Sequence, residues 1–356
     1  MTTNNKLPRT VEGLTPQWLT QVLQAKCPGI IVTGMTTDKI LWGTATKVLV
    51  DAQYAGNYKD YGIPNKLCIK GELDEKLRAQ LTGVAMTGTQ VEAGFYNDIG
   101  PKLGLPMARH WYAGYEHGMG ILILDNMAAS GYTFGAPTEP WTPELVSKSL
   151  DILAKLHGST WDRKFPDVPW LQVGSKVHRG YTEFLMSEKH WQDNFSNPDA
   201  YQLIPYVADR ERGLKGWRAM WAYDDANSHC LVHGDTHLGN MCVDPEGRPF
   251  FIDWAAPSIA HWALDVAYFV TGSLSLADRR SHEKDLLRHY LDGLARHGGP
   301  KLDWDEAWAD YGRHLLQGLL WSVLPPTMQA PKYVAAMGER YGVAMQEHKT
   351  YELLGV

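Results

Sequence analysis

The chain has 356 residues, of which 44% are hydrophobic and 21% charged. This ordinary globular balance excludes a disordered, collagen-like or coiled-coil chain, and at about 150 residues per domain the length predicts two lobes. Lysine and arginine number 34 against 40 aspartates and glutamates, and the resulting net charge of −6 lacks the basic footprint of a dedicated nucleic-acid binder. A single phosphate-binding site needs only a few charges and stays compatible with this balance.

The cysteines and the apolar runs indicate the compartment. None of the four cysteines lies in a CxxC pattern, so we expect neither a disulfide framework nor a structural zinc site. The first ten residues, MTTNNKLPRT, lack the apolar region of a secretory signal. No apolar stretch approaches the ~20 residues that a membrane-spanning helix needs. We therefore expect a cytoplasmic protein with reduced thiols and no membrane span.

Residues 1–124 are predicted to form a β-rich N-lobe. Strand-like runs occur at Ile40–Val50, Lys66–Lys70, His110–Tyr115 and Gly120–Leu124, with a helix between them at Val91–Leu103. Val91, Phe95 and Ile99 fall on one stripe of that helix, and Gly104 and Pro106 are typical of its end.

The sequence pattern changes from strand-like to helical after a hinge at residues 125–130, and residues 131–356 are predicted to form a larger helical C-lobe. Its first helix begins with Thr142 as N-cap and Pro143 at the first helical position, and it continues to about His157. Further helices are expected near 179–192, 199–222, 276–297, 303–323 and 330–350. The predicted fold class is therefore α+β, with a β-rich lobe followed by a helical one.

The segment most typical of a reaction site is Leu231–Asp253. It opens with four polar side chains, those of His233, Asp235, His237 and Asn240, and passes a turn at Asp244–Gly247. An apolar strand, Pro249–Ile252, then ends in Asp253. Such a hairpin would bring Asn240 and Asp253 together, and two oxygen ligands of this kind suit Mg²⁺.

The pattern His233-Gly234-Asp235-x-His237-x-x-Asn240, followed by Ile252-Asp253-Trp254, resembles the HGDxHxxN…IDW signature of the aminoglycoside phosphotransferase/choline kinase-like enzymes. The resemblance implies a bilobal protein-kinase-like fold, ATP or GTP as co-substrate, Mg²⁺, and phosphoryl transfer to a hydroxyl group of a small molecule. Among the branches of this family, the long helical lobe is most similar to the ecdysteroid kinase-like one.

The same resemblance implies roles for individual residues. Asp235 would orient or deprotonate the acceptor hydroxyl, His237 would lie near the transferred phosphate, and Asn240 and Asp253 would hold the metal. Asp265 resembles the structural aspartate that follows the metal-binding strand in this family.

The same resemblance implies which residues bind the nucleotide. Lys70 resembles the strand lysine that holds the nucleotide phosphates, and Glu92 resembles its ion-pair partner. The remaining nucleotide-binding candidates are the loop residues Gly43, Thr44, Ala45 and Thr46 and the hinge residues Asp125, Asn126 and Met127. The loop departs from a full GxGxxG pattern, and Asp125-Asn126 replaces the Glu-Asp pair common in relatives.

Two other interpretations stay open. His233, Asp235 and His237 alternate along the chain, so they could ligate one metal in a zinc or dinuclear hydrolase. A pseudokinase that only binds nucleotide is the non-enzymatic alternative.

The acceptor is the least determined feature. Tryptophans number 14 and tyrosines 17, and aromatic side chains around a pocket would suit an apolar alcohol or a cationic head group. An aminoglycoside would require an acidic surface. The candidate acids do not cluster in the sequence; they are Asp193, Asp199, Asp209, Asp224 and Asp225. We therefore expect an apolar or mixed alcohol.

Overall fold

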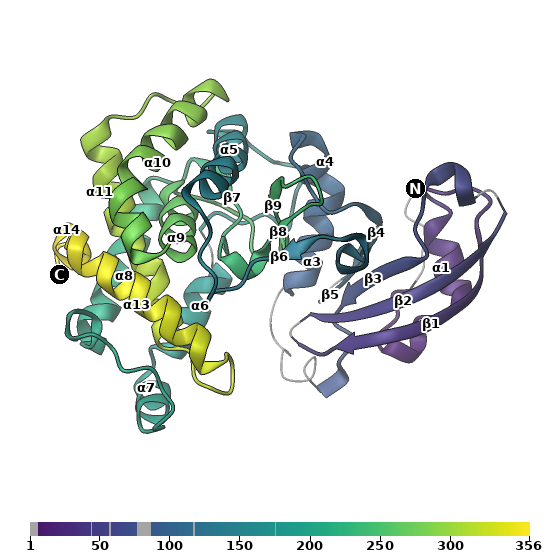
Figure 1. Ribbon diagram of the computed structural model, residues 1–356, viewed down its shortest axis with the longest axis horizontal. Coiled ribbons are helices and arrows are strands. Elements are labelled where there is room, and N and C mark those ends of the chain that lie inside the picture. The colour runs from purple at the N-terminus through teal and green to yellow at the C-terminus, as the bar shows by residue number, and fades with distance from the viewer. Residues whose placement is uncertain (1–5, 44, 57, 77–86, 117, 175) are drawn as a thin grey trace. The chain divides into compact units, whose positions relative to one another are not determined.

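A computed structural model describes residues 6–43, 45–56, 58–76, 87–116, 118–174 and 176–356 (Figure 1). The chain divides into two compact units. The first, here called the N-terminal unit, comprises residues 1–133 and 252–255, and the second, the helical unit, comprises 134–251 and 256–356. The functions that we predict for the two lobes stay predictions.

The N-terminal unit is built on one antiparallel sheet. Its strands are β1 (Ile31–Leu41), β2 (Thr46–Ala55), β3 (Lys66–Gly71), β4 (His110–Glu116) and β5 (Met119–Asp125), in the spatial order β1-β2-β3-β5-β4. Alternate residues of β2, among them Val48 and Val50, are buried on one face, as period-two patterning predicts. The run Ile40–Val50 spans the β1–β2 turn, across which Leu41 pairs with Lys47.

Helices of the N-terminal unit cover this sheet. α1 (Pro16–Leu23), which we did not predict, begins at Thr15, whose hydroxyl accepts the Trp18 amide at 3.2 Å, and it packs against β1. The helix predicted at 91–103 is three consecutive segments: α3 (Gly88–Gly94), a π-helical turn at Phe95–Ile99 and α4 (Gly100–Leu103). It ends at Gly104, in the left-handed conformation. Short 3₁₀ turns occupy Val11–Gly13, Tyr58–Tyr61 and Met127–Ser130.

The helical unit centres on α9 (Ala263–Ser273), all of whose residues are buried. Helices α5, α10, α11 and α13 pack around it (Figure 1). The other helices lie in chain order as α5 (Pro143–Thr160), α6 (Lys176–Leu185), α7 (Glu188–Phe195), α8 (Arg210–Ala226), α10 (Leu276–Arg296), α11 (Trp304–His314), α12 (Leu319–Ser322), α13 (Pro331–His348) and α14 (Thr350–Leu353), with 3₁₀ turns at Pro205–Val207, Leu238–Asn240 and Leu315–Gly318. None of the helices in the described ranges is long and apolar enough to cross a membrane.

Three of the helices predicted after residue 131 differ from the structure. The one expected at 303–323 is α11 and α12, separated by the 3₁₀ turn at Leu315–Gly318. The helix expected at 199–222 starts only at Arg210, because Pro205 interrupts the segment and the Asp209 carboxylate caps the new start by accepting the Arg212 amide at 3.0 Å. The helix expected near 179–192 is split into α6 and α7, and Ser187 caps the second.

Short strands form much of the segment Leu231–Asp253, which the sequence analysis identifies as the most typical of a reaction site. β7 (Cys230–Val232) pairs antiparallel with β10 (Ser258–Ala260), and β8 (Met241–Val243) forms a hairpin with β9 (Pro249–Phe251). The hairpin and its turn at Asp244–Gly247 confirm the prediction. β6 (Thr133–Phe134) falls at the boundary of the two units. The four cysteines, Cys27, Cys68, Cys230 and Cys242, all lie in the described ranges and form no disulfide there.

Candidate active site

In the helical unit, the loop from His233 to Asn240 is held by hydrogen bonds to Asp265 of α9. The Asp265 carboxylate accepts hydrogen bonds from the backbone N–H groups of His233 at 2.7 Å and of Gly234 at 2.8 Å. The backbone carbonyl oxygen of Asp265 accepts a hydrogen bond from the Thr236 hydroxyl at 2.8 Å. A buried carboxylate that receives two backbone donors holds a loop firmly. Asp265 therefore occupies the structural position that the resemblance implies.

A second layer of polar contacts orients Asp265 itself. The His157 ring on α5 places Nε2 3.1 Å from Asp265 Oδ2 and Nδ1 2.7 Å from the Tyr290 hydroxyl on α10. All three side chains are buried. Because α5, α9 and α10 each supply one member, the loop is connected to the core of the helical unit. No sequence pattern predicts this role for His157 and Tyr290, which lie 76 and 57 residues from His233 along the chain.

Gly234 is the residue that lets the loop turn. Its φ is +84°, and a Cβ placed there would lie 2.4 Å from the carbonyl oxygen of Ala256. Only glycine fits such a backbone conformation at such an approach. This explains a glycine directly before Asp235.

Asp235, His237 and Asn240 come together on this loop. The Asn240 amide donates to both the backbone oxygen and the carboxylate of Asp235, at 2.9 Å each. His237 Nδ1 accepts the Gly239 amide at 3.0 Å, so the ring proton lies on Nε2, 3.5 Å from Asp235 Oδ2. The Asp235 side chain keeps 38% of its surface exposed. A base that is held in place yet reachable is what proton transfer requires.

In the N-terminal unit, Lys70 is held between two carboxylates. Its Nζ lies 2.6 Å from Glu92 Oε2 and 2.7 Å from Asp253 Oδ1. Lys70 and Glu92 are almost fully buried, whereas the Asp253 side chain is 28% exposed. Burial disfavours the ammonium, but the two carboxylates outweigh it and raise the pKa of Lys70 above its usual value. The site therefore contains a permanent buried cation next to a partly exposed carboxylate.

Asp253 has an unusual backbone, with φ at +63°. An L-residue rarely adopts this region, and aspartate tolerates it better than most. The next residue, Trp254, stacks on Phe95 with ring centroids 4.1 Å apart and an interplanar angle of 7°. Both rings are fully buried. The stacking fixes residues 252–255 to the N-terminal unit and holds Asp253 in its strained conformation.

The other nucleotide candidates also lie in the N-terminal unit. Gly43 and Ala45 are in the turn between β1 and β2, Thr46 begins β2, and Thr44 lies outside the described residues. At the end of β5, the Asp125 carboxylate accepts the Trp111 indole N–H at 2.7 Å.

The hinge side chains are used internally. The Asn126 side chain accepts the Ala129 amide at 3.3 Å, and Met127 begins the 3₁₀ turn that follows. The Asp125 carboxylate is engaged as well, and the backbone N–H groups of Asp125 and Asn126 donate to the carbonyl oxygens of Arg109 and Lys66, at 3.1 Å each.

Three aromatic side chains of the helical unit lie near Asp235 or His237, and sequence reasoning did not single them out. Burial and the nearby Asp235 carboxylate together raise the pKa of Tyr181 on α6 and of Tyr268 on α9. Trp321 on α12 donates its indole N–H to the Tyr268 hydroxyl at 2.6 Å and lies 5.2 Å from the His237 ring. The Tyr181 hydroxyl contacts Met328 Sδ at 3.3 Å.

Four of the five candidate acids of the helical unit form contacts of their own. Asp193 pairs with Lys189 at 2.5 Å, and Asp209 caps α8. Asp225 and Asp224 pair with Arg179 and His314 respectively. These four carboxylates are therefore used in contacts of their own.

His233 lies in a different arrangement from the one that the hydrolase interpretation requires. His233 Nδ1 accepts the Asp235 amide at 3.2 Å, and its buried ring packs against Phe251. A nitrogen used in this way holds the loop. Across the described ranges, three His, Cys, Asp or Glu side chains are nowhere gathered as a metal-ligand set.

The comparisons with known proteins agree with the sequence resemblance. The model of the ecdysteroid kinase-like family matches residues 66–299. The choline kinase LicA from Streptococcus pneumoniae is 14% identical over 95% of this chain and 98% of its own, with a TM-score of 0.50. A microcompartment-associated aminopropanol kinase is 13% identical over 94% of this chain and 97% of its own, with a TM-score of 0.53. No curated protein matches by sequence.

These findings confirm the predicted protein-kinase-like α+β fold, with its strand-rich N-terminal and helical C-terminal parts. They also confirm the resemblance to small-molecule kinases on which the interpretation of residues 231–254 depends. The match extends over well more than half of the sequence. The chain therefore belongs to the ecdysteroid kinase-like family.

Proposed function

We propose that this chain is a Mg²⁺-dependent kinase that transfers the γ-phosphoryl group of ATP or GTP to a hydroxyl group of a small molecule. The observation that carries the proposal is the Asp235 carboxylate, partly exposed, hydrogen-bonded by Asn240 and set on a loop that Asp265 fixes. Asp235 orients the acceptor hydroxyl and takes its proton. The oxygen then bonds to the γ-phosphorus, while the bond from that phosphorus to the bridging oxygen of the nucleoside diphosphate breaks.

His237 is proposed to act beside Asp235. Because its Nδ1 accepts the Gly239 amide, Nε2 carries the proton and faces the Asp235 carboxylate. In this position Nε2–H steadies Asp235 and can donate to an oxygen of the incoming phosphoryl group.

The donor atoms of Asn240 and Asp253 fit Mg²⁺. The Asn240 nitrogen is occupied by Asp235, so its amide oxygen is the atom left for a metal, and Asp253 uses Oδ1 for Lys70. Amide and carboxylate oxygens are the ligands that Mg²⁺ prefers. When bound, the ion would neutralise phosphate charge.

Lys70 is proposed to bind the nucleotide phosphates, with Glu92 fixing its ammonium. The turn residues Gly43, Thr44, Ala45 and Thr46 would cover the phosphates, and the backbone of Asp125, Asn126 and Met127 would meet the base.

An apolar or mixed alcohol is the proposed acceptor. The Tyr181 ring, 41% exposed, lies near the Asp235 carboxylate, and such a ring contributes binding free energy by burying apolar surface. A polycationic aminoglycoside would need acidic groups, and four of the five candidate acids are already used in other contacts.

The test is transfer of label from γ-labelled ATP or GTP, with Mg²⁺, to a panel of steroid, terpenoid, amino-alcohol, aminoglycoside and hydroxyacyl compounds. Asp235→Asn should lower the rate by about two to four orders of magnitude and leave nucleotide affinity unchanged. Asp285→Asn, the same change at a side chain that is 80% exposed, is the matched control. Full turnover by Asp235→Asn would contradict the role of Asp235. Nucleotide binding without transfer to any acceptor would favour the pseudokinase.

The metal ligand is tested separately. Asp253→Ala should abolish Mg²⁺-dependent nucleotide binding, because it removes the carboxylate proposed to hold the ion. Equilibrium titration with and without Mg²⁺ measures this, and unchanged affinity for Mg-nucleotide would overturn the assignment.

A further inference from the structure

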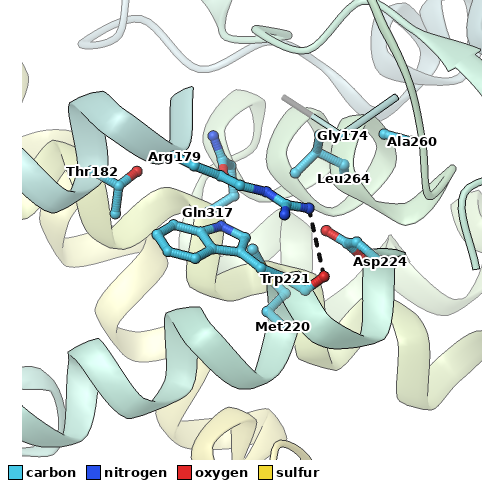
Figure 2. Close-up of a pocket in the computed structure, with 9 residues that line it drawn as sticks. All are labelled: Gly174, Arg179, Thr182, Met220, Trp221, Asp224, Ala260, Leu264 and Gln317. Carbon is cyan, nitrogen blue, oxygen red and sulfur yellow. Dashed lines mark hydrogen bonds between the residues drawn. The ribbon is translucent and has the colours of Figure 1, made fainter. Parts of the chain in front are cut away.

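One face of helix α6 is buried against the rest of the helical unit. Thr182, Leu185 and Met186, the residue after the helix, are all buried, and spacings of three and four residues place them on the same side. Arg179 of this helix extends across the Trp221 indole of α8, as Figure 2 shows, and donates a hydrogen bond to the Trp221 carbonyl oxygen at 3.5 Å. These contacts attach α6 to the fold.

Two large side chains of α6 take no part in this burial. Tyr181 is 41% and Phe184 52% exposed, and, three positions apart, they are neighbours on the helix surface. Met328, in the turn between α12 and α13, is 47% exposed, and its Sδ lies 3.3 Å from the Tyr181 hydroxyl. Tyr181, Phe184 and Met328 are together here called the α6 surface. Single exposed apolar residues are ordinary, whereas a group of them is typical of a binding site.

Both rings of the α6 surface are supported from one side. The Tyr181 hydroxyl contacts Met328, and the Phe184 ring lies 4.9 Å from the His190 ring of α7, with an interplanar angle of 49°. Side chains that are held before a ligand binds lose less conformational entropy when it does. The α6 surface therefore offers apolar area to a ligand at a small cost in ordering.

The α6 surface adjoins the residues proposed to carry out the reaction. The Asp235 carboxylate lies near Tyr181. On the other side, the Trp321 ring lies 5.2 Å from the ring of His237, and two successive backbone turns lead from Trp321 to Met328. All of these residues belong to the helical unit. A molecule whose hydroxyl group reaches Asp235 can therefore lie along the α6 surface.

We infer that the α6 surface binds the apolar body of the acceptor, with the hydroxyl group of the same molecule at Asp235. The inference rests on the proposed function, because it places both parts of one acceptor. Two rings and a thioether offer apolar contact and no charge, so an uncharged body fits best. Phe184 lies three residues beyond Tyr181, a helical rise of about 4.5 Å. The acceptor class is thereby narrowed to alcohols with an apolar body long enough to reach Phe184, which becomes the residue that selects for length.

The test uses 1-alkanols of increasing chain length as acceptors, with γ-labelled nucleotide and Mg²⁺. Over the lengths that cover the α6 surface, kcat/KM should rise by about two- to fourfold for each added methylene and then level off. ω-Amino alcohols of the same lengths should fall below the alkanols, because their charged end loses water at an uncharged surface. No rise with length, or a preference for the amino alcohols, would overturn the inference.

Variants assign the rise to the α6 surface. Phe184→Ser should flatten the dependence of kcat/KM on length and leave the shortest alkanols unchanged. Phe184→Leu keeps an apolar side chain and should retain most of the rise, which ties the serine result to lost apolar contact. Ile31→Ser, at a 51% exposed residue of β1 in the N-terminal unit, is the matched control and should keep the full rise. An undiminished rise in Phe184→Ser would overturn the inference while the kinase proposal stands.

A binding measurement separates the two proposals. Ligand-observed NMR on Asp235→Asn protein measures alkanol affinity without turnover, and Asp235→Asn combined with Phe184→Ser gives the affinity without the Phe184 ring. Affinity that rises with length only while Phe184 is present, together with no phosphoryl transfer in the unmodified protein, would support the α6 surface and overturn the kinase. Phosphoryl transfer together with an affinity that does not depend on Phe184 would overturn the α6 surface and leave the kinase.

Discussion

In the N-terminal unit, charges position one another, whereas in the helical unit one carboxylate positions backbone groups. Lys70 lies between the carboxylates of Glu92 and Asp253. Asp265 instead accepts the amides of His233 and Gly234. A buried ion pair is a weak source of net stability, although removal of one partner is costly. A carboxylate that satisfies backbone donors determines the path of the chain. The first arrangement suits a group that must stay charged, and the second suits a loop that must keep its shape.

The largest expected effect is at Asp265. Asp265→Ala should lower the free energy of unfolding of the helical unit by about 3–5 kcal/mol, because two buried amides and the His157 ring lose their acceptor together. Phosphoryl transfer should be lost as well. Denaturant unfolding measures stability, with Asp285→Ala as the exposed control. A loss below about 1 kcal/mol would show that the loop is held by other contacts.

Substitution of Lys70 should destabilise the protein less than substitution of Asp265, and a second substitution should recover part of the lost stability. Lys70→Met leaves two carboxylates in a buried site and should cost about 3 kcal/mol. Lys70→Met combined with Glu92→Gln removes one of those charges and should recover part of the loss without recovering nucleotide binding. Denaturant unfolding and nucleotide titration of the single and double variants check this. Additive losses would mean that the two side chains are not coupled.

The pH dependence tests the helical unit further. Burial disfavours a charged ring at His314, but the Asp224 carboxylate outweighs it and raises the pKa of His314 above 6.5. A raised pKa stabilises the fold fully below pH 6.5, and this contribution is lost as the pH rises through the folded value. His314→Gln should therefore destabilise the protein by about 1.5–3 kcal/mol at mildly acidic pH and by less at alkaline pH.

Unfolding free energies of the unmodified protein and His314→Gln across this pH range supply the comparison. His282→Gln, at an exposed histidine of α10, is the control. A difference that is the same at every pH would contradict the imidazolium assigned to His314.

The smallest expected effect concerns a helix start far from either site. The Ser275 hydroxyl caps α10 by accepting the Asp278 amide at 3.0 Å. Ser275→Ala should lower the free energy of unfolding by about 1 kcal/mol and leave transfer unchanged. A change in turnover would indicate that α10 affects the loop through Tyr290.

The sequence was sufficient where the chemistry depends on local spacing. Asp235 and Asn240 are five residues apart on one loop, and the hairpin turn follows directly. It failed at 199–209, where Pro205 and the Asp209 cap override a helical pattern. β1 was largely missed because most of its residues are exposed, and pairing with β2 holds it. α1 could have been found from its Thr15-Pro16 start.

The surroundings of Asp235 could not be predicted in the same way. Tyr181, Tyr268 and Trp321 come from three helices and are spread over more than a hundred residues of chain. No local pattern connects them, since tertiary packing alone brings such residues together.

The membership of residues 252–255 in the N-terminal unit has a consequence for how the protein is made. A ribosome delivers β1 to β5 long before it delivers Asp253 and Trp254. Until then Lys70 lacks one of its two carboxylates, and Phe95 lacks the ring that stacks on it. Residues 1–133 are therefore an incomplete folding unit during synthesis. The N-terminal unit reaches its final form only after residue 255 has emerged, so its maturation is timed by translation of most of the helical unit.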